Sequence, residues 1–86
     1  MEQEIVRLAV PGIDARLTAS IVETINQIRL LDLRKRPSVG ETLDWARALM
    51  TLGIETLDKP SVLATTGVIA KYATDAEQIR HALAGD

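Results

Sequence analysis

Three consecutive basic residues, Arg34, Lys35 and Arg36, form the part of the sequence best suited to contacting an anion. Pro37 and Ser38 follow them, and a helix is predicted to begin at that point. Because the first N–H groups of a helix are free and its dipole is positive at that end, a phosphate there would meet backbone donors as well as basic side chains. A basic run in a loop is also commonly no more than solvated surface, so both interpretations stay open.

Other kinds of chemistry find little support among the 86 residues. The chain has no cysteine, which excludes disulfides, thiolate metal sites and thiol chemistry. Its one histidine, His81, has no second ligand at metal-binding spacing, so we expect it at the surface. No serine or threonine is accompanied by both a base and an orienting carboxylate. The residues alone therefore predict no catalytic and no metal site.

The helix that follows the basic run has a specific start signal. Ser38 and Glu41 stand in the S-x-x-E order of a capping box, in which the hydroxyl accepts from the third helical N–H and the carboxylate accepts from the N-cap N–H. We interpret Glu41 as a cap residue, and a carboxylate in that place opposes the close approach of a phosphate. Gly53 follows Leu52 and is expected to end this helix in the left-handed conformation.

Three further residues of this central helix have a structural and a functional interpretation. Asp44 and Arg47 lie three positions apart, which is the spacing of a weak surface ion pair. Alternatively, Asp44 holds a neighbouring element and fixes the orientation of the domain. Trp45 is expected in the core with its N–H bonded to one acceptor, and its alternative is a contact with a neighbouring subunit.

Length and composition indicate one small helical domain over residues 1–86. Hydrophobic residues make up 47% of the chain but aromatic ones only 2%, so the core must be built from Leu, Ile, Val and Ala. Such residues suit packed helices, and no alternating strand pattern occurs. We predict an all-α fold, a small bundle of four to five helices.

The expected helices follow the spacing of apolar residues and the capping signals. They are a short helix over Glu2–Leu8, a second from its cap Asp14 to about Leu31, the central helix from Ser38 to Leu52, a fourth from Pro60 to Thr65, and a last from about Asp75 to Ala84. Gly67 is expected to interrupt the fourth helix before a further turn. Thr74 and Glu77 repeat the capping-box order before the last one.

The order of segments PGI, LRKRPSVGETLDWARAL, LG, LD and VLATTGVIAKY resembles the C-terminal lid domain of MoxR-type AAA+ ATPases. The branch it is most similar to accompanies von Willebrand A-domain proteins and includes the carbon monoxide dehydrogenase accessory ATPases. The resemblance covers nearly the whole chain and is most specific at 34–49 and 65–72. In this family the lid is a helical bundle that follows an α/β core and closes over the nucleotide.

The resemblance implies that residues 13–86 are the lid bundle and residues 1–12 a linker from an absent core. The chain has neither a G-x-x-x-x-G-K-[ST] phosphate loop nor an acidic Walker B strand, so it is not expected to hydrolyse ATP alone. ATP and magnesium would belong to the parent protein. The implied partners are its own core, neighbouring subunits of a chaperone-like remodelling ring, and a von Willebrand A-domain protein.

The resemblance also places the start of the central helix, with Ser38 and the three basic residues before it, close to the nucleotide. Many AAA+ lids carry an arginine there, the sensor-2 residue, which reaches the γ-phosphate. Alignment on Arg47 puts Gly40 at that position, a departure from the family pattern. Either this branch does without the sensor-2 arginine, or Arg34, Lys35 or Arg36 supplies the charge from the preceding loop. Of these three we favour Arg36, the basic residue closest to the helix.

A second family segment ends at Lys71 and Tyr72, which the resemblance makes candidates for the junction between core and lid. The simpler interpretation is that Lys71 ends a helix, where it would face free carbonyl groups. An exposed apolar patch along Ile5, Val10 and Ile13 is expected where the core would dock.

The competing hypothesis is a free-standing helical adaptor or a helix-turn-helix-like binding module formed by 14–31 and 38–52. Glu41 and Asp44 near the start of the second of these helices would repel phosphates, and the net charge is −2, so nucleic acid is not an expected partner. No apolar run approaches the roughly 20 residues that span a bilayer, so no membrane partner is expected. A cytoplasmic location fits these features.

Overall fold

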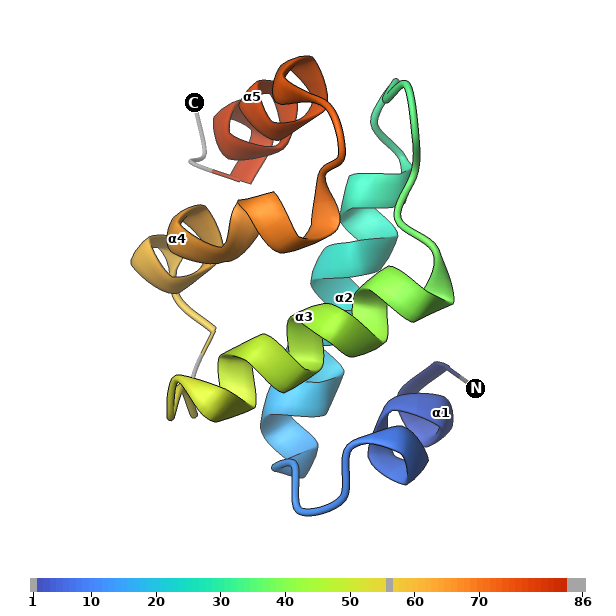
Figure 1. The fold of residues 1–86 in the computed structure, drawn as a ribbon, viewed down its shortest axis with the longest axis vertical. Helices are drawn as coiled ribbons and strands as arrows, with labels where there is room; N and C mark the ends of the chain where they lie inside the picture. Colours follow the sequence, from blue (N-terminus) through green and yellow to red (C-terminus); the bar gives the residue numbers. More distant parts are fainter. Residues whose placement is uncertain (1, 56, 84–86) are drawn as a thin grey trace.

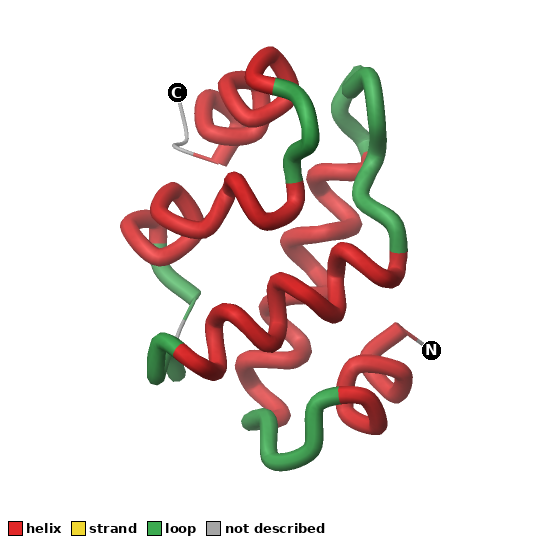
Figure 2. Tube along the Cα trace, viewed as in Figure 1, coloured by secondary structure: helices red, strands yellow, loops and turns green. Residues whose placement is uncertain are grey.

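Helices account for all the regular structure in the residues that the computed structural model describes, 2–55 and 57–83 (Figures 1 and 2). Over these residues they are α1 (Glu2–Ala9), α2 (Ala15–Arg29), α3 (Val39–Thr51), α4 (Lys59–Ile69) and α5 (Ala73–Leu83). The bundle measures 33 × 23 × 17 Å along its principal axes. The predicted all-α class is confirmed. No helix of this described part is both long and apolar enough to cross a membrane.

The central helix α3 packs against α1, α2 and α4, whereas α5 packs chiefly on α4. Figure 1 shows α3 crossing α2, with α1 near one end of the bundle and α4 and α5 near the other. The face of α3 that points inward carries Trp45, Ala46 and Leu49, all fully buried. Aliphatic side chains surround them, and those most completely enclosed are Val6, Ile21, Ile25, Ile28, Ile69 and Ile79.

The indole of Trp45 has its one polar atom satisfied. Its Nε1–H donates to the hydroxyl oxygen of Thr65 on α4 over 2.7 Å, and that hydroxyl donates in turn to the carbonyl of Ser61 over 2.7 Å. A buried N–H without an acceptor would cost about 1–3 kcal/mol. Trp45 is therefore the core residue with one bonded acceptor that was predicted.

Three of the predicted helix ends are confirmed. Asp14 caps α2 by accepting from the N–H of Arg16 over 2.9 Å. Ser38 and Glu41 form the full capping box at the start of α3, with both reciprocal bonds present. Gly53 follows α3 with φ of +73°, in the left-handed region that glycine enters without strain.

The predictions for the last two helices are partly wrong. The helix α4 runs without a break through Gly67 to Ile69, because the burial of Val62, Thr66 and Ile69 along it outweighs the roughly 1 kcal/mol that a glycine costs a helix. The helix α5 begins at Ala73, so Thr74 lies inside it and is not its N-cap. The predicted end at residue 84 lies outside the described residues.

The first helix belongs to the same bundle. Its Val6 is fully buried and contributes to the core together with Val10, which is 4% exposed. The expectation that Val10 is part of an exposed patch is therefore wrong, because its side chain faces the core. Ile5 is 40% exposed and Ile13 is partly buried. That residues 1–12 also lead from a separate core stays a prediction.

Replacing Thr65 by valine should lower the free energy of unfolding by about 1–3 kcal/mol, because the buried Trp45 N–H would lose its acceptor. Urea titration followed by the fluorescence of Trp45, the chain's one tryptophan, measures this change. Thr66→Val is the matched control, since the hydroxyl of Thr66 donates only to the carbonyl of Val62 within α4. Equal losses in the two variants would mean that the indole bond contributes nothing.

Candidate functional site

The loop between α2 and α3 lies beside the connection between α4 and α5 (Figures 1 and 2). The loop supplies Arg34, Lys35 and Arg36, and the connection supplies Lys71, so four cations meet at one corner of the bundle. We call these four residues the basic corner. It unites the two sequence segments on which the resemblance is most specific.

Asp75, in the first turn of α5, holds the backbone of the basic loop. Its two carboxylate oxygens accept from the N–H of Arg34 over 2.9 Å and from the N–H of Lys35 over 3.1 Å. The residue is only 2% exposed. Each oxygen of this buried carboxylate thus has a backbone donor, as buried polar groups require.

Glu41 is buried beneath the basic corner, next to Lys35 and Lys71. Its Oε1 accepts from the N–H and the hydroxyl of Ser38 and from Nζ of Lys35, at distances of 2.9 to 3.0 Å. Its Oε2 is 3.9 Å from Nζ of Lys71 and makes no hydrogen bond within the described residues. Burial pushes the pKa of Glu41 upward, but the bonds from Ser38 and Lys35 outweigh it, so the pKa lies below its ordinary value.

Arg34 lies against the aromatic ring of Tyr72. The centre of its guanidinium is 4.5 Å from the ring centroid, within the range of a cation–π contact. Both side chains stay largely exposed, so this contact orients the guanidinium without removing it from solvent. Tyr72 thus lies within the chain's own basic corner, and whether it also meets a core stays a prediction.

Arg36 is attached to the end of α2. Its Nε donates to the carbonyl oxygen of Arg29 over 2.9 Å, and Nε of Arg29 donates to the carbonyl of Pro37 over 3.0 Å. The guanidinium of Arg29 also holds Glu2 of α1 through two bonds of 2.7 and 2.9 Å. The position of Arg36 is therefore fixed by backbone on both sides of the loop.

Asp44 and Arg47 form the surface pair expected from their spacing, with 3.4 Å between Oδ1 and Nη1. Both side chains are more than half exposed, at 64% and 53%. Such a pair contributes well under 1 kcal/mol, so the structure gives Asp44 no role in holding another element of the described bundle.

The arrangement of charge is the main property of this corner. Four cations lie at the surface and two carboxylates, Glu41 and Asp75, are buried, so these six groups sum to 4 − 2 = +2, and the exposed Asp32 of the same loop brings the sum to +1. The chain as a whole carries −2. An anion approaching from solvent therefore meets guanidinium and ammonium groups before it meets either buried acid.

This geometry supports electrostatic binding and gives no catalytic constellation. Within 2–55 and 57–83 no cluster of three or more His, Cys, Asp or Glu could hold a metal ion. His81 is exposed on the last turn of α5, as expected. The fixed backbone and the exposed cations together can position an anionic group, but no described residue here is arranged as a nucleophile with its base.

Comparison of the chain with protein-family models, with curated proteins and with solved structures finds no match. The resemblance described for the sequence therefore stays a prediction.

Sequence reasoning did not identify Arg29, Glu2 or Asp75. All three act through partners at least 8 residues away, and Asp75 and the loop are 40 or more residues apart. One weak signal existed for Asp75, which is an acidic residue between Thr74 and Ala76 at the start of the predicted last helix. Arg29 gave none, because its spacing resembles that of any charged residue in the last turn of a helix.

Replacing Asp75 by asparagine should loosen the basic loop, because the amide group would face one of the two backbone N–H donors with a donor of its own. We expect a loss of about 1–3 kcal/mol in the free energy of unfolding and faster hydrogen exchange at the amides of Arg34 and Lys35. Glu77→Gln removes an exposed charge from the same helix and serves as the control. Unchanged protection of the two amides would contradict the role given to Asp75.

The Glu2–Arg29 pair predicts a pH dependence. Hydrogen bonds from Arg29 lower the pKa of Glu2 below its ordinary value of 4.5. The stability that this pair contributes is therefore fully present above about pH 4.5 and is lost as the pH falls through the lowered pKa. In urea titrations from about pH 7 to about pH 3, Glu2→Gln should be less stable than the wild type at neutral pH, and the difference should shrink in acid.

Glu4→Gln is the control for this measurement, since Glu4 lies on the same helix without an ion pair among the described residues. A difference for Glu2→Gln that does not change with pH would contradict the assignment.

Proposed function

We propose that this chain is the helical lid of a MoxR-type AAA+ ATPase, in which the basic corner faces the phosphates of ATP and magnesium held by a core outside this sequence. Binding of ATP would draw the lid toward the core, and the bundle would pass this movement to the next subunit of a cytoplasmic, chaperone-like ring. A von Willebrand A-domain protein would be the accessory partner. The chain itself would be a regulatory element with no hydrolytic activity.

The observation that carries the proposal is the placement of four exposed cations over two buried carboxylates at the start of α3. A γ-phosphate near Ser38 would lie in the positive potential of Arg34, Lys35 and Arg36. The backbone that carries these side chains is held by Asp75 and by Arg29, so little backbone entropy would be lost when a phosphate binds.

Glu41 sets how close such a phosphate could come. Its lowered pKa keeps it charged near neutral pH, and its Oε1 occupies the N–H of Ser38 that an anion would otherwise take. A phosphate would therefore be contacted by the side chains above the capping box and not by the helix terminus itself. Arg36 is the proposed main contact, with its Nε held by Arg29 and the rest of its guanidinium facing outward.

The proposal predicts weak binding of magnesium-ATP by the isolated chain. In an amide NMR titration we expect saturable shifts confined to 34–41 and 71–75, with a dissociation constant on the order of 1 mM. Arg36→Ala should weaken this binding by about two- to fivefold, the effect of one exposed charge. Magnesium-ADP should bind more weakly than magnesium-ATP, because it lacks the γ-phosphate.

The control variant is Arg16→Ala, which removes the same charge at the other end of α2. If Arg16→Ala weakens binding as much as Arg36→Ala does, the effect is general attraction between nucleotide and cations and not binding at the basic corner. Shifts spread over all cations of the chain would lead to the same conclusion. Absence of saturable shifts up to about 20 mM nucleotide would contradict a phosphate contact at this corner.

A further inference from the structure

The guanidinium of Arg29 joins three segments of the bundle. Its terminal nitrogens donate to both carboxylate oxygens of Glu2, at the start of α1, over 2.7 and 2.9 Å. Its Nε donates to the carbonyl oxygen of Pro37, just before α3, over 3.0 Å. One planar group at the end of α2 is therefore bonded to the first helix and to the basic loop at the same time.

A second bond crosses the same gap in the opposite direction. The Nε of Arg36 donates to the carbonyl oxygen of Arg29 over 2.9 Å. Because Arg36 and Pro37 are consecutive, the two bonds close a ring between the last residue of α2 and this part of the loop. Loss of the bond to Pro37 would free the backbone that carries Arg36 and so weaken the remaining bond.

Glu2 holds the guanidinium in the orientation that reaches Pro37. A carboxylate that accepts two parallel N–H bonds fixes the plane of an arginine fork, whereas a single contact leaves a long side chain free to rotate. The remaining side-chain contact, to Oδ1 of Asn26 on the same helix, is longer at 3.4 Å. The side chains of Glu2 and Arg29 are only 14% and 26% exposed, so salt screens their attraction less than that of a surface pair. The position of α1 thus decides how Arg29 is held.

We propose that Glu2 is a positioning residue of the anion site at the basic corner, and that the docking of α1 controls the affinity of this corner through Arg29. With α1 in place, the loop at 36–37 is held and Arg36 is preorganised for an anion. Without the carboxylate of Glu2, that order has to be regained when the anion binds. The effect on affinity rests on the anion binding proposed above, whereas the link between α1 and the loop is a property of the chain alone.

Charge by itself predicts the opposite effect. Glu2 is an anion, and its removal makes the surroundings of the basic corner more positive, which favours a bound phosphate. If Glu2 acts only by its charge, Glu2→Gln tightens anion binding. If it acts by holding Arg29, Glu2→Gln weakens anion binding. The sign of the change therefore separates the two explanations.

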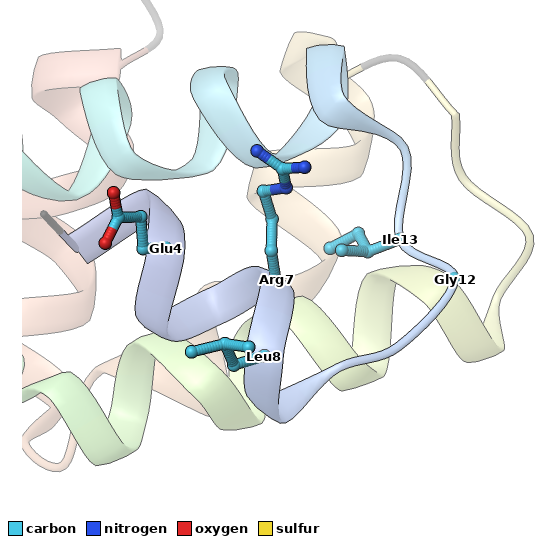
Figure 3. Close-up of a pocket in the computed structure, with 5 residues that line it drawn as sticks. All are labelled: Glu4, Arg7, Leu8, Gly12 and Ile13. Carbon is cyan, nitrogen blue, oxygen red and sulfur yellow. The ribbon is translucent and has the colours of Figure 1, made fainter.

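In an amide NMR titration with magnesium-ATP, Glu2→Gln should raise the dissociation constant at least about twofold. Glu4→Gln is the matched control, because it removes the same charge from the same helix. Glu4 lines a hollow together with Arg7 and Leu8 (Figure 3) and has no ion pair within the described part of the chain. Its replacement should leave the dissociation constant unchanged or lower it slightly. Binding by Glu2→Gln that is as tight as binding by Glu4→Gln overturns the proposal.

The link itself is measured without nucleotide, from the rate at which the Nε–H of Arg36 exchanges with solvent. This exchange should be at least about threefold faster in Glu2→Gln and unchanged in Glu4→Gln. Arg29→Lys keeps the positive charge but lacks the planar fork that bonds Glu2 and Pro37 together, so it should speed the exchange as well. Thermal unfolding by circular dichroism checks that each variant retains the fold.

The two measurements separate this inference from the proposed function. If the wild type does not bind magnesium-ATP, the proposed function fails, whereas the exchange at Arg36 still tests the link to α1. Unchanged exchange in Glu2→Gln overturns the link even if ATP binds. A change confined to Arg29→Lys also overturns it, because Arg29 would then order the loop without α1.

Discussion

The indole of Trp45 is fully enclosed in a chain whose one other aromatic residue lies at the surface. Aliphatic residues therefore provide the remaining core surface, and the largest side chain sits where α3 meets its neighbours. Its N–H must find an acceptor inside the core, and Thr65 supplies it from α4. This hydrogen bond ties the middle of α3 to α4. The basic corner lies just before the start of α3 and just after the end of α4.

At that corner Glu41 and Asp75 are buried, whereas the four cations are exposed. Burying Glu41 and Asp75 would be strongly unfavourable for isolated carboxylates, but each accepts backbone N–H donors that would otherwise be unsatisfied at a helix start or in the loop. The same bonds order the backbone of the loop, while its cationic side chains stay exposed to solvent. The positive surface of this corner, on a chain with a net charge of −2, thus arises because backbone N–H groups draw the two carboxylates inside.

The features that the sequence could predict are local ones. The capping box of Ser38 and Glu41, the cap at Asp14 and the end at Gly53 depend on residues within a few positions of one another, and so does the periodicity that placed Trp45 in the core. The predicted helix bounds were wrong where tertiary contacts outweigh local preference. Gly67 stays helical because its neighbours are buried, and α5 starts early.

The sequence could not predict two sets of bonds, those from the loop to Asp75 and those from Arg29 to Glu2 and Pro37. Their partners lie 8 to 41 residues apart, and no periodic pattern relates residues at such separations.

The attachment of Asp75 to the loop has a consequence for how the last helix and the basic loop are coupled. Because α5 rests chiefly on α4, its carboxylate bonds to the N–H groups of Arg34 and Lys35 are its link to the segment between α2 and α3. By thermodynamic reciprocity, the free energy that couples the ordered loop to the docked α5 acts in both directions, so a ligand that favours the ordered loop also favours the docked position of α5. A partner that displaces α5 would likewise destabilise the ordered conformation of the basic loop. The carboxylate of Asp75 therefore couples the loop and α5 in both directions.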